Sequence, residues 1–170
     1  MQRIVFYRHE KDGEAFYEYN FYDHQFAPTN LVVRKILMAM LESVREQLTH
    51  LEVEYNDKML ADKLGKRAGE LLRFLGAARE NLQENRSGDV VVSRQFRAEL
   101  TPERYDYFYQ MKDVSELSHY RLLAGERERI VFYFNRYLLL QLPIGDEERF
   151  YAALTERQVP YKIEAVSPPI

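Results

Sequence analysis

The sequence predicts an α+β fold in which an antiparallel sheet, built from strands near both ends of the chain, packs against a long central helical hairpin. Eight of the 23 aromatic residues lie in residues 1–26 and twelve in 105–170, whereas only three lie in 27–104. The central part carries aliphatic side chains at helical spacing instead. We therefore expect the strand-forming ends to meet in one sheet or one core, so that residues 1–170 form a single domain.

The first expected element is a β-hairpin within residues 1–26. Residues 3–9 and 14–22 are rich in β-branched and aromatic types. Asp12–Gly13 between them favours a tight turn, because glycine accepts the positive φ that such a turn requires. Alternation along the second strand places Ala15, Tyr17, Tyr19 and Phe21 on one face and Glu14, Phe16, Glu18 and Asn20 on the other.

The helical hairpin is predicted over residues 29–85. Thr29 or Asn30 can cap a first helix, whose apolar stripe reaches about residue 53. Asn56 then offers a break and a cap before a second helix that runs to about residue 85. Small residues along this second helix form a groove in which the first helix can lie, namely Ala61, Gly65, Gly69 and Gly76.

Residues 89–166 are expected to form a mixed β/α segment. Thr101 and Pro102 are typical of a helix start, with a capping hydroxyl followed by proline in the first turn. Gly145–Asp146 introduces another helix. Strands are predicted at about 90–99, 120–123, 129–134, 137–142 and 160–166.

Composition excludes several classes of site. The absence of cysteine removes disulfides, thiolate zinc sites and cysteine nucleophiles. No signal peptide is visible, and no apolar run approaches the roughly 20 residues that span a bilayer. We therefore expect a cytoplasmic protein without membrane association.

No catalytic set converges in the sequence, and we expect neither a cofactor nor a metal. The four candidate ligands lie at opposite ends of two strands that the predicted hairpin would bring side by side, which would permit a metal cluster: His9, Glu10, Asp23 and His24. Ordinary surface polarity explains the same residues more simply. None of the six serines lies in a GxSxG elbow, so nothing indicates a serine nucleophile.

The leading functional hypothesis is a non-enzymatic interaction or regulatory protein, such as an inhibitor, immunity-type or adaptor module. Tyrosine and phenylalanine are abundant, and both are favoured at protein interfaces. Candidate partner-binding anchors are Phe16, Tyr22 and Phe26. A sheet covered on both faces would bury these side chains instead. The partner's identity, including a second copy of the chain, stays open.

An RNA-directed protein is the alternative. Residues 56–97 carry nine basic and six acidic side chains, although the whole chain has a net charge of −3. The interleaved carboxylates are equally typical of a solvated helix face. Candidate nucleic-acid-binding residues are Arg94, Arg97, Arg121 and Arg129.

The stretch from Met111 to Leu142 resembles the closing strands of RelE/HigB-type toxins, which are small ribosome-dependent RNases. Tyr120, Arg121, Gly125, Arg129, Tyr133 and Leu138–Leu140 occupy places comparable to those in that family. The opening IVFYRHEKDGE is similar to the start of some HigB-like chains. The resemblance implies an RNA substrate and two helices before the sheet. Where those toxins usually end in a basic catalytic tail, residues 143–158 are acidic.

Overall fold

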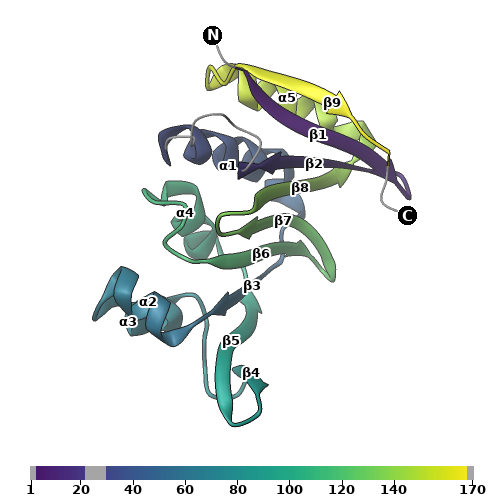
Figure 1. Ribbon diagram of the computed structural model, residues 1–170. Helices are drawn as coiled ribbons and strands as arrows, with labels where there is room; N and C mark the ends of the chain where they lie inside the picture. The colour runs from purple at the N-terminus through teal and green to yellow at the C-terminus, as the bar shows by residue number, and fades with distance from the viewer. Residues whose placement is uncertain (1–2, 22–29, 168–170) are drawn as a thin grey trace.

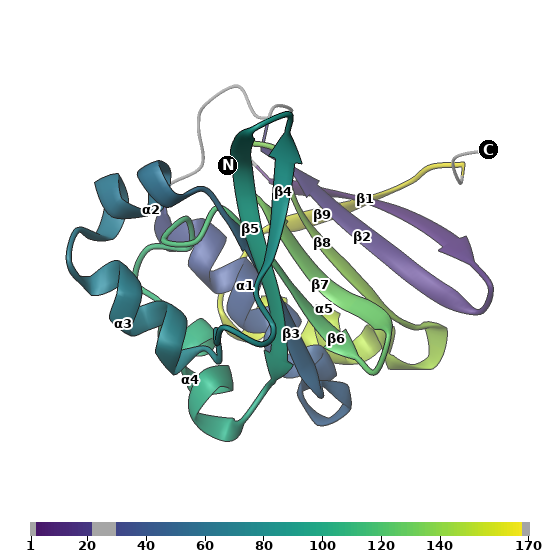
Figure 2. The same cartoon turned by 90° about the horizontal axis from the view of Figure 1, so that it is seen from below.

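The computed structural model describes residues 3–21 and 30–167. Within them, nine strands form one sheet in the order β4-β5-β3-β6-β7-β8-β2-β1-β9, and the helices lie on one side of it (Figures 1 and 2). The strands are β1 (Ile4–Lys11), β2 (Glu14–Asn20), β3 (His50–Tyr55), β4 (Gln83–Ser87), β5 (Val90–Glu99), β6 (His119–Ala124), β7 (Arg127–Tyr133), β8 (Tyr137–Pro143) and β9 (Tyr161–Ala165). The α-helices are α1 (Asn30–Val44), α2 (Asp57–Leu64), α3 (Arg67–Phe74), α4 (Pro102–Gln110) and α5 (Glu147–Glu156).

Strands from the two ends of the chain lie side by side, as predicted. β2 pairs with β1 on one side and with β8 on the other. β1 also pairs with β9, but this pair is parallel, so the sheet is mixed and not purely antiparallel. The parallel pairing is possible because α5 carries the chain back along the sheet before β9 begins.

The N-terminal hairpin forms at the predicted turn. Asp12 has φ of 54° and Gly13 has φ of 79°, the left-handed conformations of a type I′ turn. Ala15, Tyr17 and Tyr19 are fully buried against the helices. The alternation predicted for this strand is therefore confirmed.

The predicted helical hairpin over 29–85 is wrong. α1 ends at Val44, and a short 3₁₀ turn at Arg45–Gln47 leads into β3, which lies between β5 and β6. The segment His50–Tyr55 buries every second side chain, namely Leu51, Val53 and Tyr55. This two-residue period belongs to a strand, and pairing on both edges outweighs the helical spacing that continues from α1.

The second predicted helix is broken at two glycines. Gly65 has φ of +60° and separates α2 from α3, and Gly76 has φ of +106° and ends the helical region. Neither conformation fits inside a helix, so these residues act as breaks and not as a packing groove. The chain then continues into β4, an edge strand of the sheet.

The core lies between the sheet and the helices. α1 packs against α5 and against β7 and β8. Phe150 of α5 contacts the rings of Phe6 and Tyr17, with centroid distances of 5.4 and 5.1 Å. None of the described helices is long and apolar enough to cross a membrane.

Candidate functional site: the open face of the sheet

One face of the sheet carries no described helix, and we call it the open face. Side chains of the opposite face, such as Phe96, Phe132 and Leu138, are buried under the helical layer. Alternation then directs their strand neighbours onto the open face, and Figure 2 shows the helices gathered on the other side. An antiparallel sheet with one solvated face is usually polar on that face. On the open face of this sheet, apolar side chains lie among the polar ones near the centre.

Apolar side chains form an interrupted stripe on the open face over β7, β8, β2 and β1, with Glu18 between Leu139 and Tyr7 and Gln141 opposite Phe16. Tyr133 lies opposite Tyr137, with ring centroids 6.0 Å apart, and Val131 lies opposite Leu139. Phe16 stacks on His9 with an interplanar angle of 6°. Tyr133 remains 37% exposed. We define the apolar stripe as Tyr7, Phe16, Val131, Tyr133, Tyr137 and Leu139.

A cavity of about 200 Å³ adjoins the stripe next to Tyr133. Met59, His119 and Phe134 contribute to its walls. Met59 is 52% exposed and Phe134 41% exposed, so apolar surface continues from the stripe into the cavity. Its size suits one large side chain.

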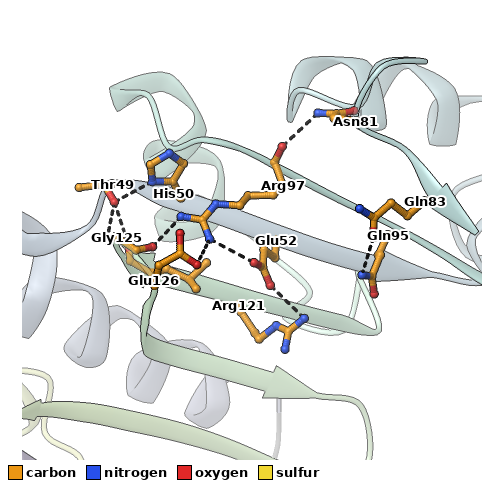
Figure 3. A network of polar contacts seen from close by, with 11 residues as sticks. Thr49, His50, Glu52, Asn81, Gln83, Gln95, Arg97, Arg121, Gly125 and Glu126 are labelled. Carbon is orange, nitrogen blue, oxygen red and sulfur yellow. Dashed lines mark hydrogen bonds and ion pairs between the residues drawn. The ribbon is translucent and has the colours of Figure 1, made fainter. Parts of the chain in front are cut away.

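Charged side chains border the stripe on β3, β5 and β6. Glu52 lies between Arg97 and Arg121, because these three residues pair across adjacent strands (Figure 3). Arg121 Nη2 lies 2.9 Å from one carboxylate oxygen, and Arg97 Nη1 lies 3.5 Å from the other. Arg97 also donates to the carbonyl of Gly125 at 2.7 Å and contacts Glu126 at 3.1 Å.

A second polar row joins Ser93, Glu54 and His119. Ser93 Oγ donates to Glu54 at 2.7 Å, and His119 Nδ1 lies 3.4 Å from the other oxygen of that carboxylate. Burial, and then the charge of Arg121, holds the pKa of His119 below its ordinary value despite Glu54. The carboxylate separates serine from imidazole, so the histidine is not placed to activate the hydroxyl as it would be in a catalytic triad.

The opposite border of the stripe contains a buried ion pair. Glu14 is 5% exposed and Arg129 is 7% exposed, and Arg129 Nη1 donates to Glu14 at 2.9 Å. Arg127 donates to the same carboxylate. A buried carboxylate is costly unless it is paired, so these contacts are part of the local fold.

The structure brings four of the seven predicted site residues onto the open face. Phe16 lies in the apolar stripe, and Arg97, Arg121 and Arg129 lie at its borders. Arg94 points to the helical side instead, where it contacts Asp57 at 3.0 Å and Glu84 at 2.6 Å. Tyr22 and Phe26 lie outside the described residues.

The candidate metal ligands are only partly described. His9 stacks on Phe16, and Glu10 contacts Arg8 at 2.6 Å. Asp23 and His24 lie outside the described residues. Across residues 3–21 and 30–167, no three His, Asp or Glu side chains gather in a group that could hold a metal ion.

Sequence reasoning missed the centre of the open face. The sequence predicts Val131 and Tyr137 only as parts of strands, and it singles out Tyr133 and Leu139 only through the resemblance to RelE/HigB-type toxins. A signal was present, because the strands near 130 and 138 carry apolar residues at both alternating positions. Such runs leave an apolar face even after the core face is filled.

Comparisons with known proteins give no match: no protein-family model, no curated protein and no solved structure corresponds to this chain.

Proposed function

We propose that this chain is a non-enzymatic interaction protein, of the inhibitor, immunity or adaptor kind, that docks a protein partner on the open face. The observation that carries the proposal is the apolar stripe on a sheet face that no described helix covers. Tyr133 is the exposed member of the stripe, Val131 is buried within it, and the other four side chains are half-buried, so a partner would bury the apolar surface that remains open around Tyr133. The adjoining cavity offers room for one side chain of the partner.

The charge balance of the open face favours protein over RNA. Phosphate binding needs a surplus of positive charge, whereas this face is balanced. A mixed polar border around an apolar centre is the usual anatomy of a protein interface. By strand register and side-chain contacts, its basic side chains include Lys11, Arg97, Arg121, Arg127, Arg129 and Lys162, and its acidic ones include Glu14, Glu18, Glu52, Glu54, Glu99, Glu128 and Glu164.

The arginines named for RNA binding are already engaged. Arg94, Arg97 and Arg121 each contact a carboxylate, and so does Arg129. A phosphate would have to compete with these carboxylates. The RelE/HigB-type alternative therefore has less support from the geometry than a protein partner.

A matched pair of variants tests the proposal. Tyr133→Asp places a charge in the apolar stripe, and Phe74→Asp places one at a similarly exposed site on α3, since these side chains are 37% and 44% exposed. Tagged wild-type chain and both variants are used for quantitative affinity capture from extract. Any captured protein is then purified and titrated against all three chains, after circular dichroism confirms folding.

We expect a partner whose affinity falls at least tenfold in Tyr133→Asp and stays unchanged in Phe74→Asp. The expected loss corresponds to about 1.4 kcal/mol or more. Partners that bind both variants equally, or a complete lack of Tyr133-dependent binding, would contradict the proposal.

A further inference from the structure

β9 forms one outer edge of the sheet, and no described strand pairs with its free side (Figure 1). The opposite edge strand, β4, is irregular, because the register shifts between Asn85 and Arg86. Such bulges are a common means of keeping another strand from pairing with an edge. β9 instead pairs with β1 over five residues without any register shift. The edge at β9 is therefore regular enough to receive a further strand.

Alternate residues of β9 direct their backbone groups away from β1. Two hydrogen bonds fix this alternation: Ile4 N donates to the carbonyl of Pro160 at 2.7 Å, and Val166 N donates to the carbonyl of Arg8 at 2.8 Å. In a parallel pair every second residue bonds to the same neighbour, so the even-numbered residues from 160 to 166 face β1. The odd-numbered residues point their N–H and C=O groups to the free side, namely Tyr161, Ile163 and Ala165.

The side chains of β9 divide between the two faces of the sheet. Tyr161 and Ile163 pack against the core, and the Tyr161 ring stacks on Tyr151 of α5 with centroids 5.8 Å apart. Lys162 and Glu164 lie on the open face by alternation. Lys162 Nζ lies 3.2 Å from Glu164 Oε1, and their side chains are 54% and 41% exposed. β9 thus presents one cation and one anion on the same face, two residues apart.

An antiparallel copy of β9 fits this edge when a twofold axis passes through Ile163. Ile163 then faces Ile163 of the second copy, and Tyr161 faces Ala165. These are the outward-pointing residues, so all of their N–H and C=O groups find partners across the contact. The same register places Lys162 of each copy opposite Glu164 of the other. These are the pairs without backbone hydrogen bonds, in which side chains come closest together.

The neighbouring twofold registers are unfavourable. An axis through Lys162 would set two lysines opposite each other, and an axis through Glu164 would set two glutamates opposite each other. Like charges directly opposite in a sheet are destabilising. An axis through Tyr161 or Ala165 would pair only part of the strand. The charges of β9 therefore select the register centred on Ile163.

We propose that β9 pairs with β9 of a second copy of this chain, giving a twofold dimer with one continuous sheet. A second copy is favoured over an unrelated strand because the charges of β9 complement themselves. The contact involves one short strand from each chain, so the dimer is weak and depends on concentration. It is independent of the partner proposed for the open face, since β8, β2 and β1 separate β9 from Tyr133 on β7.

A charge exchange tests the register. Sedimentation velocity measures the dissociation constant of the whole chain from micromolar to millimolar concentration, after circular dichroism confirms folding of each variant. Lys162→Glu sets glutamate against glutamate, and Glu164→Lys sets lysine against lysine. We expect each change alone to raise the dissociation constant at least tenfold, because two symmetric pairs are affected.

Mixing these two variants provides the rescue. The introduced glutamates then face the lysines of the other variant, so an equimolar mixture should form a heterodimer with the affinity of the wild-type dimer. Lys58→Glu is the matched control, because it makes the same change of charge at an exposed position on α2. That variant should dimerise like the wild type.

Amide hydrogen exchange, followed by NMR, locates the contact on the backbone. The amides of Ile163 and Ala165 point to the free side, so we expect fast exchange in dilute protein and slow exchange in concentrated protein. The amides of Lys162 and Glu164 bond to β1 and should be protected at both concentrations.

Several results would overturn the proposal. These are a chain that stays monomeric at millimolar concentration, a dimer that Lys162→Glu leaves unchanged, no recovery in the mixture, or unchanged exchange at Ile163 and Ala165. Protection of these amides only after another protein is added would show that an unrelated strand occupies the edge. Tyr133→Asp leaves β9 intact, so the failure of this proposal and the failure of the proposed function are distinguishable.

Discussion

Gly76 and Asn81 hold the turn between α3 and β4 in a backbone conformation that few residue types permit. Gly76 has φ of +106°, and a Cβ at this position would lie 2.5 Å from the Cβ of Ala98 on β5. Asn81 fixes the same turn, because its amide donates to the carbonyls of Gly76 and Arg97 at 2.9 and 3.0 Å. The glycine therefore permits both the backbone path and the close approach to the sheet.

Gly76→Ala is expected to lower the free energy of unfolding by about 2–4 kcal/mol, because backbone strain adds to the steric clash. Gly88→Ala is the control: Gly88 has φ of +61° but no atom within 4 Å of an added Cβ, so only strain of about 1–2 kcal/mol applies. Urea denaturation measures both. Equal losses in the two variants would show that the contact with Ala98 is unimportant.

A partly buried polar cluster ties α5 to the sheet. Glu147 accepts hydrogen bonds from Arg8 Nε at 2.6 Å and from the Tyr17 hydroxyl. Burial alone would raise the pKa of Glu147, but these two donors outweigh burial and hold the pKa below its ordinary value of 4.5. The charged carboxylate is thus the form that the fold prefers.

Stability should therefore fall in acid. A carboxylate with a lowered pKa in the folded state stabilises the fold above its unfolded-state pKa, and this contribution is lost as pH falls through the folded-state value. We expect Glu147→Gln to cost about 1–3 kcal/mol at pH 7 and to flatten the decline of the unfolding free energy below about pH 5. Chemical denaturation across pH measures this, with the exposed neighbour Glu148→Gln as control. An unchanged acid profile in Glu147→Gln would contradict the account.

At the scale of elements, turn and cap residues predicted the positions of helices and strands better than the spacing of apolar residues did. The hairpin of β1 and β2 follows from Asp12–Gly13, and the start of α4 follows from Thr101, whose hydroxyl accepts from Arg104 N at 3.2 Å. Periodicity misled for 45–85, because leucines spaced for a helix occur there in β3, in the two short helices α2 and α3, and in the segments between elements. The segment His50–Tyr55 is a strand because it pairs with β5 and β6, which are distant in sequence. The local spacing of apolar residues carries no information about such pairing.

The N-cap of α2 ties a helix to the sheet. Asn56 Oδ1 accepts from Met59 N at 3.1 Å, while its Nδ2 donates to the carbonyl of Val92 on β5 at 2.9 Å. Asn56→Ala removes both bonds and should cost about 1–2 kcal/mol. Asn56→Asp keeps the cap acceptor and loses only the donor to β5. Thermal denaturation should rank wild type above Asn56→Asp and Asn56→Ala lowest; equal stability of Asn56→Ala and wild type would refute the cap's role.

At the scale of the molecule, the candidate site depends on which sheet face is uncovered, and this depends on topology. Alternation along the strand is enough to place Phe16 and Tyr17 on different faces of the sheet. Its neighbours Tyr133 and Leu139 could not, because the order of β2, β8 and β7 joins segments more than a hundred residues apart. Glu52 was missed for the same reason, since a strand predicted as helix cannot place its side chains between Arg97 and Arg121.

Whole-molecule electrostatics give a prediction about nucleic acid. The net charge is −3, and the four arginines proposed for RNA contact carboxylates. We expect no measurable binding to single-stranded RNA by fluorescence anisotropy, even at about 0.05 M salt, where phosphate contacts are strong. Binding that weakens steeply as salt increases, and that Arg121→Gln reduces, would favour the RelE/HigB-type alternative.

The most direct test of the account is site-specific photo-cross-linking from the open face. A benzophenone amino acid replaces Tyr133 in one variant, Phe74 in a second and Ile144 in a third; the natural side chains are 37%, 44% and 39% exposed, so accessibility is matched. We predict one discrete protein adduct from position 133 and none from positions 74 or 144. Adducts from position 74 or 144 without one from position 133, or an RNA adduct at position 133, would contradict a protein partner on the open face.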